Sequence, residues 1–136
     1  MKVAVRYYTR SGNTEKLAKA IAEAVDAHAE TVTTPLAEKV DVLFLGCSYY
    51  AFDVDEAVKS FIHANKEKIG KIVCFGTSAM MKSTYKPMKK VADEAGVLLA
   101  AEDFHCRGSF GPMHKDRPDA KDLKKTAEFA GRVVTE

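Results

Sequence analysis

The amino-acid sequence predicts an α/β fold: one domain, residues 1–136, with a three-layer, doubly wound sheet of five parallel strands in the order 2-1-3-4-5. Segments with strand patterns alternate with segments of helical apolar spacing along the chain. Two strand segments are almost entirely apolar, as expected for strands that helices cover on both faces. This alternation implies right-handed crossovers between parallel strands.

The first strand and the first helix are separated by a polar turn. Residues 2–8 are rich in β-branched and aromatic side chains, which favour a strand. Asn13 or Thr14 is expected to cap the helix that follows. Apolar side chains then recur with the spacing of one helix face, at Leu17, Ala18, Ile21, Ala22 and Val25.

The second and third strands lie close together in the sequence. Residues 30–34 alternate weakly and are predicted to form an edge strand that Pro35 ends. Only about six residues lead to the next strand, so this crossover has room for a single helical turn. Residues 41–46 form a nearly continuous apolar run, which is typical of a buried parallel strand.

The second helix is predicted from a capping pattern and an apolar stripe. Asp53 stands three residues before Glu56, as in a capping box with Asp as the N-cap. Gly70 is predicted to end this helix. Residues 71–76 are then predicted to form the fourth strand, followed by a polar loop over 77–84.

The last two helices flank the fifth strand. Residues 85–95 have a helical pattern, and Gly96 is expected to end it. Residues 97–104 are predicted to form the fifth strand, and a glycine-containing loop over 105–117 follows. Asp119 is expected to cap the last helix.

Charge and cysteine content exclude several classes of protein. The formal net charge of +2 is too small to indicate binding of nucleic acid. Three widely spaced cysteines without a CxxC pair are not a disulfide framework, and they indicate a reducing compartment. The sequence has no signal-peptide pattern and no apolar run of about 20 residues. We therefore expect a cytoplasmic protein that does not bind membranes.

Three loops are expected to meet at one edge of the sheet. In a doubly wound sheet, ligands bind outside the carboxyl ends of the strands, where the strand order reverses. With the order 2-1-3-4-5, this point lies between strands 1 and 3. It gathers the loops 9–14, 47–53 and 77–84, which therefore supply the candidate site residues.

The loop after the first strand has the sequence Thr9-Arg10-Ser11-Gly12-Asn13-Thr14. It lacks the acidic residues of a response regulator, the cysteine of a small phosphatase, and the motifs GxxxxGK(S/T) and GxGxxG. Three hydroxyls and a glycine suit a phosphate group, because a helix N-terminus presents amide N–H groups and partial positive charge. The alternative is a loop that only caps the helix.

The segment from Tyr8 to Lys16 resembles the flavodoxin signature, which is (S/T)-x-(S/T)-G-x-T after a strand. The order of strands and helices resembles that family over the whole chain. The resemblance implies a flavodoxin-like fold, FMN as the cofactor, and one- or two-electron chemistry at the flavin ring. It also implies that residues 9–14 bind the 5′-phosphate of FMN.

The resemblance further implies that the flavin ring lies between the loops after the third and fourth strands. Tyr49 or Tyr50 is expected to stack on the ring, whereas Met80 and Met81 either lie against it or fill gaps in the core. The candidates in the first of these loops are Ser48, Tyr49, Tyr50, Ala51 and Phe52. Those in the second are Thr77, Ser78, Ala79, Met80 and Met81.

The segment after the fifth strand contains His105 and Cys106. Cys106 is interpreted as a buried apolar residue rather than as a reactive thiol. The four histidines are interpreted as surface or structural residues, since none has the spacing of a metal site or a catalytic triad. The sequence therefore predicts no catalytic side chain and no metal ligand.

Three functions are compatible with the sequence. The first is an electron carrier that works between a reductase and an acceptor protein, as a monomer or weak dimer. The second is an FMN-dependent NAD(P)H or quinone reductase. The slightly basic charge favours this reading, because carrier flavodoxins are typically acidic and dock on basic partners. The length of 136 residues and the short loops count against it, because such reductases are usually longer and oligomeric. The third is a binding module with the same fold but without FMN.

Overall fold

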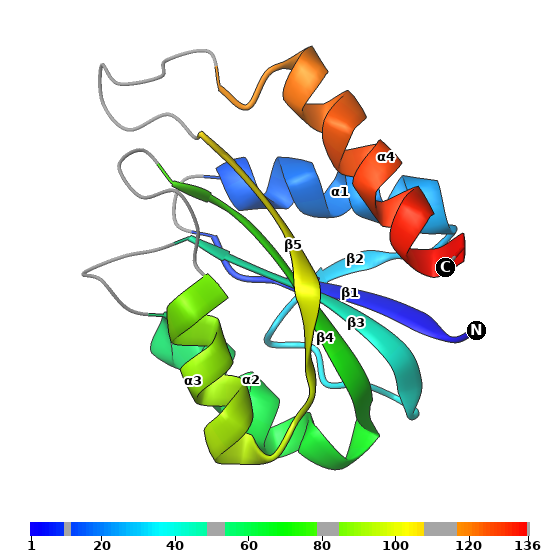
Figure 1. Ribbon diagram of the computed structural model, residues 1–136. Coiled ribbons are helices and arrows are strands. Elements are labelled where there is room, and N and C mark those ends of the chain that lie inside the picture. The colour runs from blue at the N-terminus through cyan, green and yellow to red at the C-terminus, as the bar shows by residue number, and fades with distance from the viewer. Residues whose placement is uncertain (10–11, 49–53, 79–84, 108–116, 136) are drawn as a thin grey trace.

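The computed structural model describes residues 1–9, 12–48, 54–78, 85–107 and 117–135. It confirms the predicted fold class, with five parallel strands in the order β2-β1-β3-β4-β5 (Figure 1). The strands are β1 (Val3–Tyr7), β2 (Ala29–Thr31), β3 (Val40–Ser48), β4 (Ile69–Ser78) and β5 (Leu99–Arg107). The helices are α1 (Asn13–Val25), α2 (Glu56–Asn65), α3 (Tyr85–Ala95) and α4 (Ala120–Thr135), with a 3-10 turn η1 (Lys66–Lys68).

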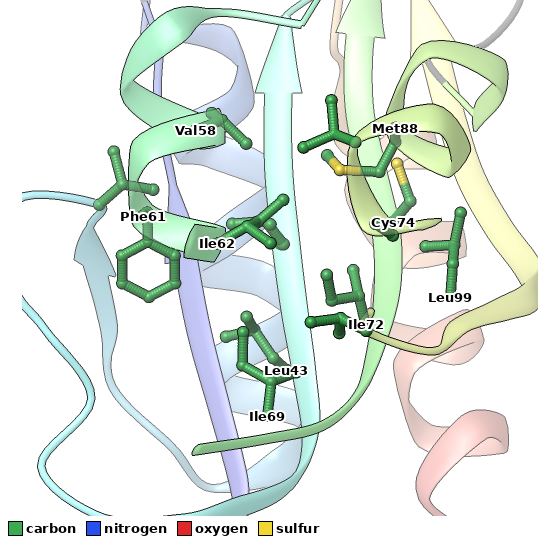
Figure 2. Close-up of a cluster of buried hydrophobic side chains, with 14 of the residues drawn as sticks. Leu43, Val58, Phe61, Ile62, Ile69, Ile72, Cys74, Met88 and Leu99 are labelled. Carbon is green, nitrogen blue, oxygen red and sulfur yellow. The ribbon is translucent and has the colours of Figure 1, made fainter. Parts of the chain in front are cut away.

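Helices cover both faces of the sheet, α1 and α4 on one side and α2 and α3 on the other (Figure 1). Successive residues of β3 and β4 face opposite sides, so each strand contributes to two clusters of buried side chains. Burial of each large apolar side chain contributes about 1.5–3 kcal/mol. The cluster beside α2 and α3 includes Leu43, Val58, Phe61, Ile62, Ile72 and Met88 (Figure 2). The cluster beside α1 and α4 includes Val5, Leu17, Ile21, Phe44, Phe75 and Phe129.

The crossover from β2 to β3 contains a turn and no helix, although it has room for one helical turn. The backbone N–H of Thr34 donates to the carbonyl of Thr31 at 3.1 Å. Arg6, buried in β1, fixes the segment from the sheet side. Its Nε donates to the carbonyl of Thr34 at 2.9 Å and its Nη2 to the carbonyl of Pro35 at 3.3 Å.

Leu36, in the same crossover, is held from the side of α2. Its backbone N–H donates to Oδ1 of Asn65 at 3.0 Å, and its carbonyl accepts from Nζ of Lys68 at 3.0 Å. Asn65 is buried and also donates to the carbonyl of Phe61 at 2.9 Å. Side chains from β1, α2 and η1 therefore bind the backbone groups that a helical turn would have bonded within itself.

The predicted start of the second helix is wrong. α2 begins at Glu56, and its N-cap is Asp55, whose Oδ1 accepts from the backbone N–H of Ala57 at 3.1 Å. Asp53, which was expected to be the cap, lies outside the described residues. Two aspartates stand close to the same apolar stripe, and the nearer one caps the helix.

The predicted end of the second helix is wrong as well. α2 ends at Asn65, and Gly70 lies inside β4 rather than at a helix terminus. A Cβ at position 70 would lie 2.6 Å from the carbonyl oxygen of Asp41. Gly70 therefore permits the close approach of β3 to β4, which a sequence pattern alone does not distinguish from a helix end.

The strands at the carboxyl edge of the sheet are longer than predicted. At this edge, Ser48 of β3 is paired with Thr77 of β4, and Thr77 is paired with Cys106 of β5. A polar side chain does not prevent its backbone from pairing with a neighbouring strand. The polar composition therefore led to a prediction of loops at positions where the strands continue. The residues predicted to lie in loops but found in strands are Cys47, Ser48, Thr77, Ser78, His105, Cys106 and Arg107.

The ends of the last two helices follow the prediction. α3 spans Tyr85–Ala95, and Gly96 after it has a φ of 73°. Asp119 caps α4, because its Oδ1 accepts from the N–H of Asp122 at 2.9 Å and its own N–H donates to Oδ2 of Asp122 at 2.9 Å. Within the described ranges, no helix combines the length and the apolar character needed to cross a membrane.

Candidate functional site

The first helix begins at Asn13, and Gly12 is its N-cap. Gly12 has a φ of 88° and a ψ of −5°, and no side chain at this position caps the helix. The expectation that Asn13 or Thr14 is the cap is therefore wrong, since both lie inside the first turn. α2 and α4, by contrast, each begin with a capping aspartate. Among the residues that the structure describes, no carboxylate caps the N-terminus of α1, which leaves it suited to an external anion.

Thr9 organises the turn that leads into α1. Its Oγ1 accepts a hydrogen bond from the backbone N–H of Gly12 at 2.9 Å, and its side chain is partly buried. A Cβ at Gly12 would have no atom within 4 Å, so the backbone here borders open space. An amide-rich helix terminus, an adjacent hydroxyl and room beside a glycine fit the requirements of a phosphate group.

Thr14 connects the first turn of α1 to the end of β4. It is fully buried, and its Oγ1 lies 3.1 Å from Oγ1 of Thr77, which is also buried. The structure therefore brings together one residue from each of two predicted site loops. It also shows that the hydroxyl of Thr14 has a partner in the sheet.

Tyr7, at the end of β1, connects this strand to the first turn of α1. Its hydroxyl donates to Oε2 of Glu15 at 3.1 Å, and Oε1 of Glu15 pairs with Nζ of Lys19 at 3.1 Å. Burial and the bond to Glu15 raise the pKa of Tyr7. The bond from Lys19, and then that from Tyr7, lowers the pKa of Glu15. The phenol thus stays protonated and the carboxylate ionised at neutral pH, which preserves the link between β1 and α1.

The ends of β1, β3 and β4 lie together at this edge of the sheet. The backbone N–H of Tyr8 donates to the carbonyl of Gly46 at 3.0 Å, and Ser48 is paired with Thr77. The described ends of the three site loops are therefore adjacent, as the strand order predicts.

Most of the predicted ring-binding residues lie outside the described part of the chain, and so do two residues of the phosphate loop. Their roles stay predictions, including stacking of Tyr49 or Tyr50 on a flavin ring. The same holds for the side chains of Ser48 and Ser78, whose backbone is described. The predicted residues outside the described ranges are Arg10, Ser11, Tyr49, Tyr50, Ala51, Phe52, Ala79, Met80 and Met81.

The structure shows the contacts of two residues of β5, His105 and Cys106, which the sequence did not predict in detail. The His105 side chain is 3% exposed, with Nδ1 at 2.8 Å from Oδ2 of Asp103 and Nε2 at 3.9 Å from Sγ of Cys74. The spacing of Asp103 and His105 on one strand face is the signal that could have predicted this pair. Cys106, which was expected to be buried, is partly buried, and this burial raises the pKa of its thiol to about 12. Among the residues described, no three His, Cys, Asp or Glu side chains are grouped to hold a metal ion.

Comparison with known proteins gives one consistent family. A family model described as a flavodoxin domain matches residues 4–109. An uncharacterized protein of Methanocaldococcus jannaschii is 26% identical over 90% of each chain.

Solved structures agree with the fold. A flavodoxin from the domain Archaea has a TM-score of 0.78 at 16% identity, with 99% of this chain and 97% of that chain covered. Oxidised flavodoxin 1 from Bacillus cereus has a TM-score of 0.74 at 21% identity, with 100% and 99% covered. At these identities the structural likeness concerns the fold, whereas the family model concerns the sequence. Members of the matched family bind flavin, typically FMN.

Proposed function

Because this chain belongs to the flavodoxin family, we propose that it binds FMN and transfers electrons between a reductase and an acceptor protein. The observation that supports this most directly is the N-terminus of α1. It opens at Gly12 without a side-chain cap, beside the hydroxyl of Thr9. The two other helices whose N-cap residues are described, α2 and α4, are capped by aspartate. An anion such as the 5′-phosphate of FMN would complete the first helix in place of a carboxylate.

The chain's own groups would act as an anchor for the cofactor. The first-turn amides of α1 and the hydroxyls of Thr9, Ser11 and Thr14 would bind the phosphate, and the loops after β3 and β4 would border the ring. Bound FMN would supply one- and two-electron redox chemistry, so no catalytic side chain is required. We expect soluble redox proteins as partners, a cytoplasmic location, and a monomer or weak dimer.

A binding and reduction experiment tests this function. Flavin-free protein is titrated with FMN and with riboflavin, and the complex is then reduced stepwise with dithionite. Tighter binding of FMN than of riboflavin is expected, because only FMN carries the phosphate. Two resolved one-electron reduction steps would support the carrier. A single two-electron step, together with oxidation of NAD(P)H, would instead support the reductase, and absence of binding would contradict the FMN proposal.

Ser11→Ala is expected to weaken FMN binding by about 10- to 100-fold, because a hydrogen bond to a charged group contributes about 1.5–3 kcal/mol. Riboflavin affinity should not change. The measurement is the dissociation constant of each flavin, with Ser60→Ala as the matched control on the exposed surface of α2. An unchanged FMN affinity in Ser11→Ala would show that the phosphate binds elsewhere.

A further inference from the structure

The hydrogen bond between Thr14 and Thr77 joins elements that are not neighbours in the sheet. Thr14 lies in the first turn of α1, which follows β1, whereas Thr77 lies near the end of β4. β3 separates β1 from β4 in the strand order. The side chain of Thr77 therefore reaches α1 across an intervening strand, on the side of the sheet that α1 and α4 cover.

Gly46 of β3 contributes to the space in which this contact forms. It is paired with Tyr7 on one side and with Phe75 on the other. A Cβ at position 46 would overlap the ring of Phe75, which is fully buried beside α1 and α4. The ring of Phe75 therefore lies over Gly46, and Thr77, two residues further along β4, faces the same side. The first turn of α1 packs above this surface.

Because both side chains are buried, water does not compete with the hydrogen bond between the two hydroxyls. Thr14 is 0% exposed and Thr77 is 3% exposed, so water does not readily replace either partner. A threonine hydroxyl has one proton and two acceptor lone pairs. When Thr77 donates to Thr14, the hydroxyl of Thr14 keeps its own proton for another acceptor. The contact thus fixes the position of the Thr14 hydroxyl in the candidate phosphate loop, and either hydroxyl can be the donor.

We infer that Thr77 is a positioning residue for the phosphate end of the FMN site, acting through Thr14 without touching the phosphate. This inference rests on the proposed function. It separates the role of Thr77, which lies near the end of β4, from that of the residues after it. Thr77 serves the phosphate end, whereas the residues after it were predicted to border the ring.

The test compares Thr77→Val with wild type. Valine has nearly the shape of threonine but no hydroxyl, so only the hydrogen bond is lost. Thr77→Val should bind FMN about tenfold more weakly, the expected effect of one buried hydrogen bond. Riboflavin, which lacks the phosphate, should bind within about twofold of wild type. Thr77→Ser retains a hydroxyl and should restore FMN affinity to within about threefold of wild type.

A double-mutant cycle tests whether Thr77 acts through Thr14. Thr14→Val alone should weaken FMN binding, and adding Thr77→Val should cause little further loss, because residues that act as one unit are not additive. Fully additive losses would overturn the inference. Thermal unfolding of each flavin-free variant verifies that it is folded, and Thr77→Ala replaces Thr77→Val if the valine variant does not fold.

The outcomes distinguish the inference from the function on which it rests. Wild-type protein that binds neither flavin would overturn both. Wild-type protein that binds FMN, with Thr77→Val binding it equally well, would overturn only the inference. Equal losses of FMN and riboflavin in Thr77→Val would also overturn it, because the effect would then concern the ring or the whole fold.

Discussion

Gly12 has a φ of 88°, in the left-handed region where a residue with a Cβ is strained. Nothing lies within 4 Å of the position that its Cβ would occupy. The requirement for glycine therefore comes from the backbone conformation and not from crowding. The same conformation turns the chain from β1 into α1 and brings its N–H within 2.9 Å of Oγ1 of Thr9.

Gly12→Ala is expected to lower the free energy of unfolding by about 1–2 kcal/mol, the cost of placing alanine in the left-handed region. The measurement is urea unfolding of the flavin-free protein. Gly131→Ala is the matched control, because Gly131 lies inside α4 and its Cβ would also have no atom within 4 Å. That substitution should be neutral or stabilise by up to about 1 kcal/mol. Equal losses in both variants would contradict the conformational explanation.

At the scale of single elements, the start of α4 is fixed by side chains on both sides of the cap. Asp119 and Asp122 bind each other's backbone N–H groups. Arg117 binds both carboxylate oxygens of Asp122, at 2.5 and 2.7 Å. The Arg117 guanidinium, and with it the backbone N–H of Asp119, holds the pKa of Asp122 below its ordinary value of 3.8.

This pKa gives stability a defined dependence on pH. The native state favours the ionised form of Asp122, so its contribution is complete above pH 3.8 and is lost as the pH falls through the lower, native pKa. Asp122→Asn should therefore destabilise the protein by about 1–3 kcal/mol near neutral pH. The difference from wild type should shrink in acid.

Urea unfolding at neutral pH and again below pH 3.8 measures this difference. Asp93→Asn, which removes an exposed i,i+4 partner of Lys89, is the control and should change stability by less than about 1 kcal/mol. A difference for Asp122→Asn that persists unchanged in acid would show that charge is not its cause.

Element boundaries show where sequence reasoning succeeds and where it does not. α3 and the caps at Gly96 and Asp119 were predicted correctly, because they depend on residues adjacent in the sequence. Gly70 was misassigned because its role depends on Asp41 in a neighbouring strand. The extension of β4 through Thr77 likewise depends on pairing with β3 and β5.

At the scale of the whole molecule, the strand order and the edge where the site loops meet follow from the alternation of strands and helices. The bond between Thr14 and Thr77 was not predicted, although each residue was assigned to the site. It depends on two residues 63 positions apart in the sequence, which the order of the strands in the sheet brings together. Contacts at such a separation leave no periodic signal in one sequence.

The rate at which the three cysteine thiols react tests whether the whole protein is folded. Cys47 and Cys74 are fully buried, and the raised pKa of Cys106, about 12, keeps its thiol protonated. Near pH 8, native protein should therefore react slowly with iodoacetamide at all three thiols, compared with protein in concentrated guanidinium chloride. The measurement is the number of alkylated sites against time by mass spectrometry. A thiol that reacts in the native protein as fast as in the denatured protein would contradict the assigned environments.

The crossover between β2 and β3 is anchored before it reaches its most exposed part. Arg6 binds the carbonyls of Thr34 and Pro35, and Leu36 is bound by Asn65 and Lys68. The next three residues, 37–39, are exposed, and the backbone enters β3 directly after them. A foreign peptide inserted at this point would leave those anchors in place, as loop tips generally tolerate added length. The protein thus offers an attachment point for a tag or sensor on the opposite end of the sheet from the proposed cofactor.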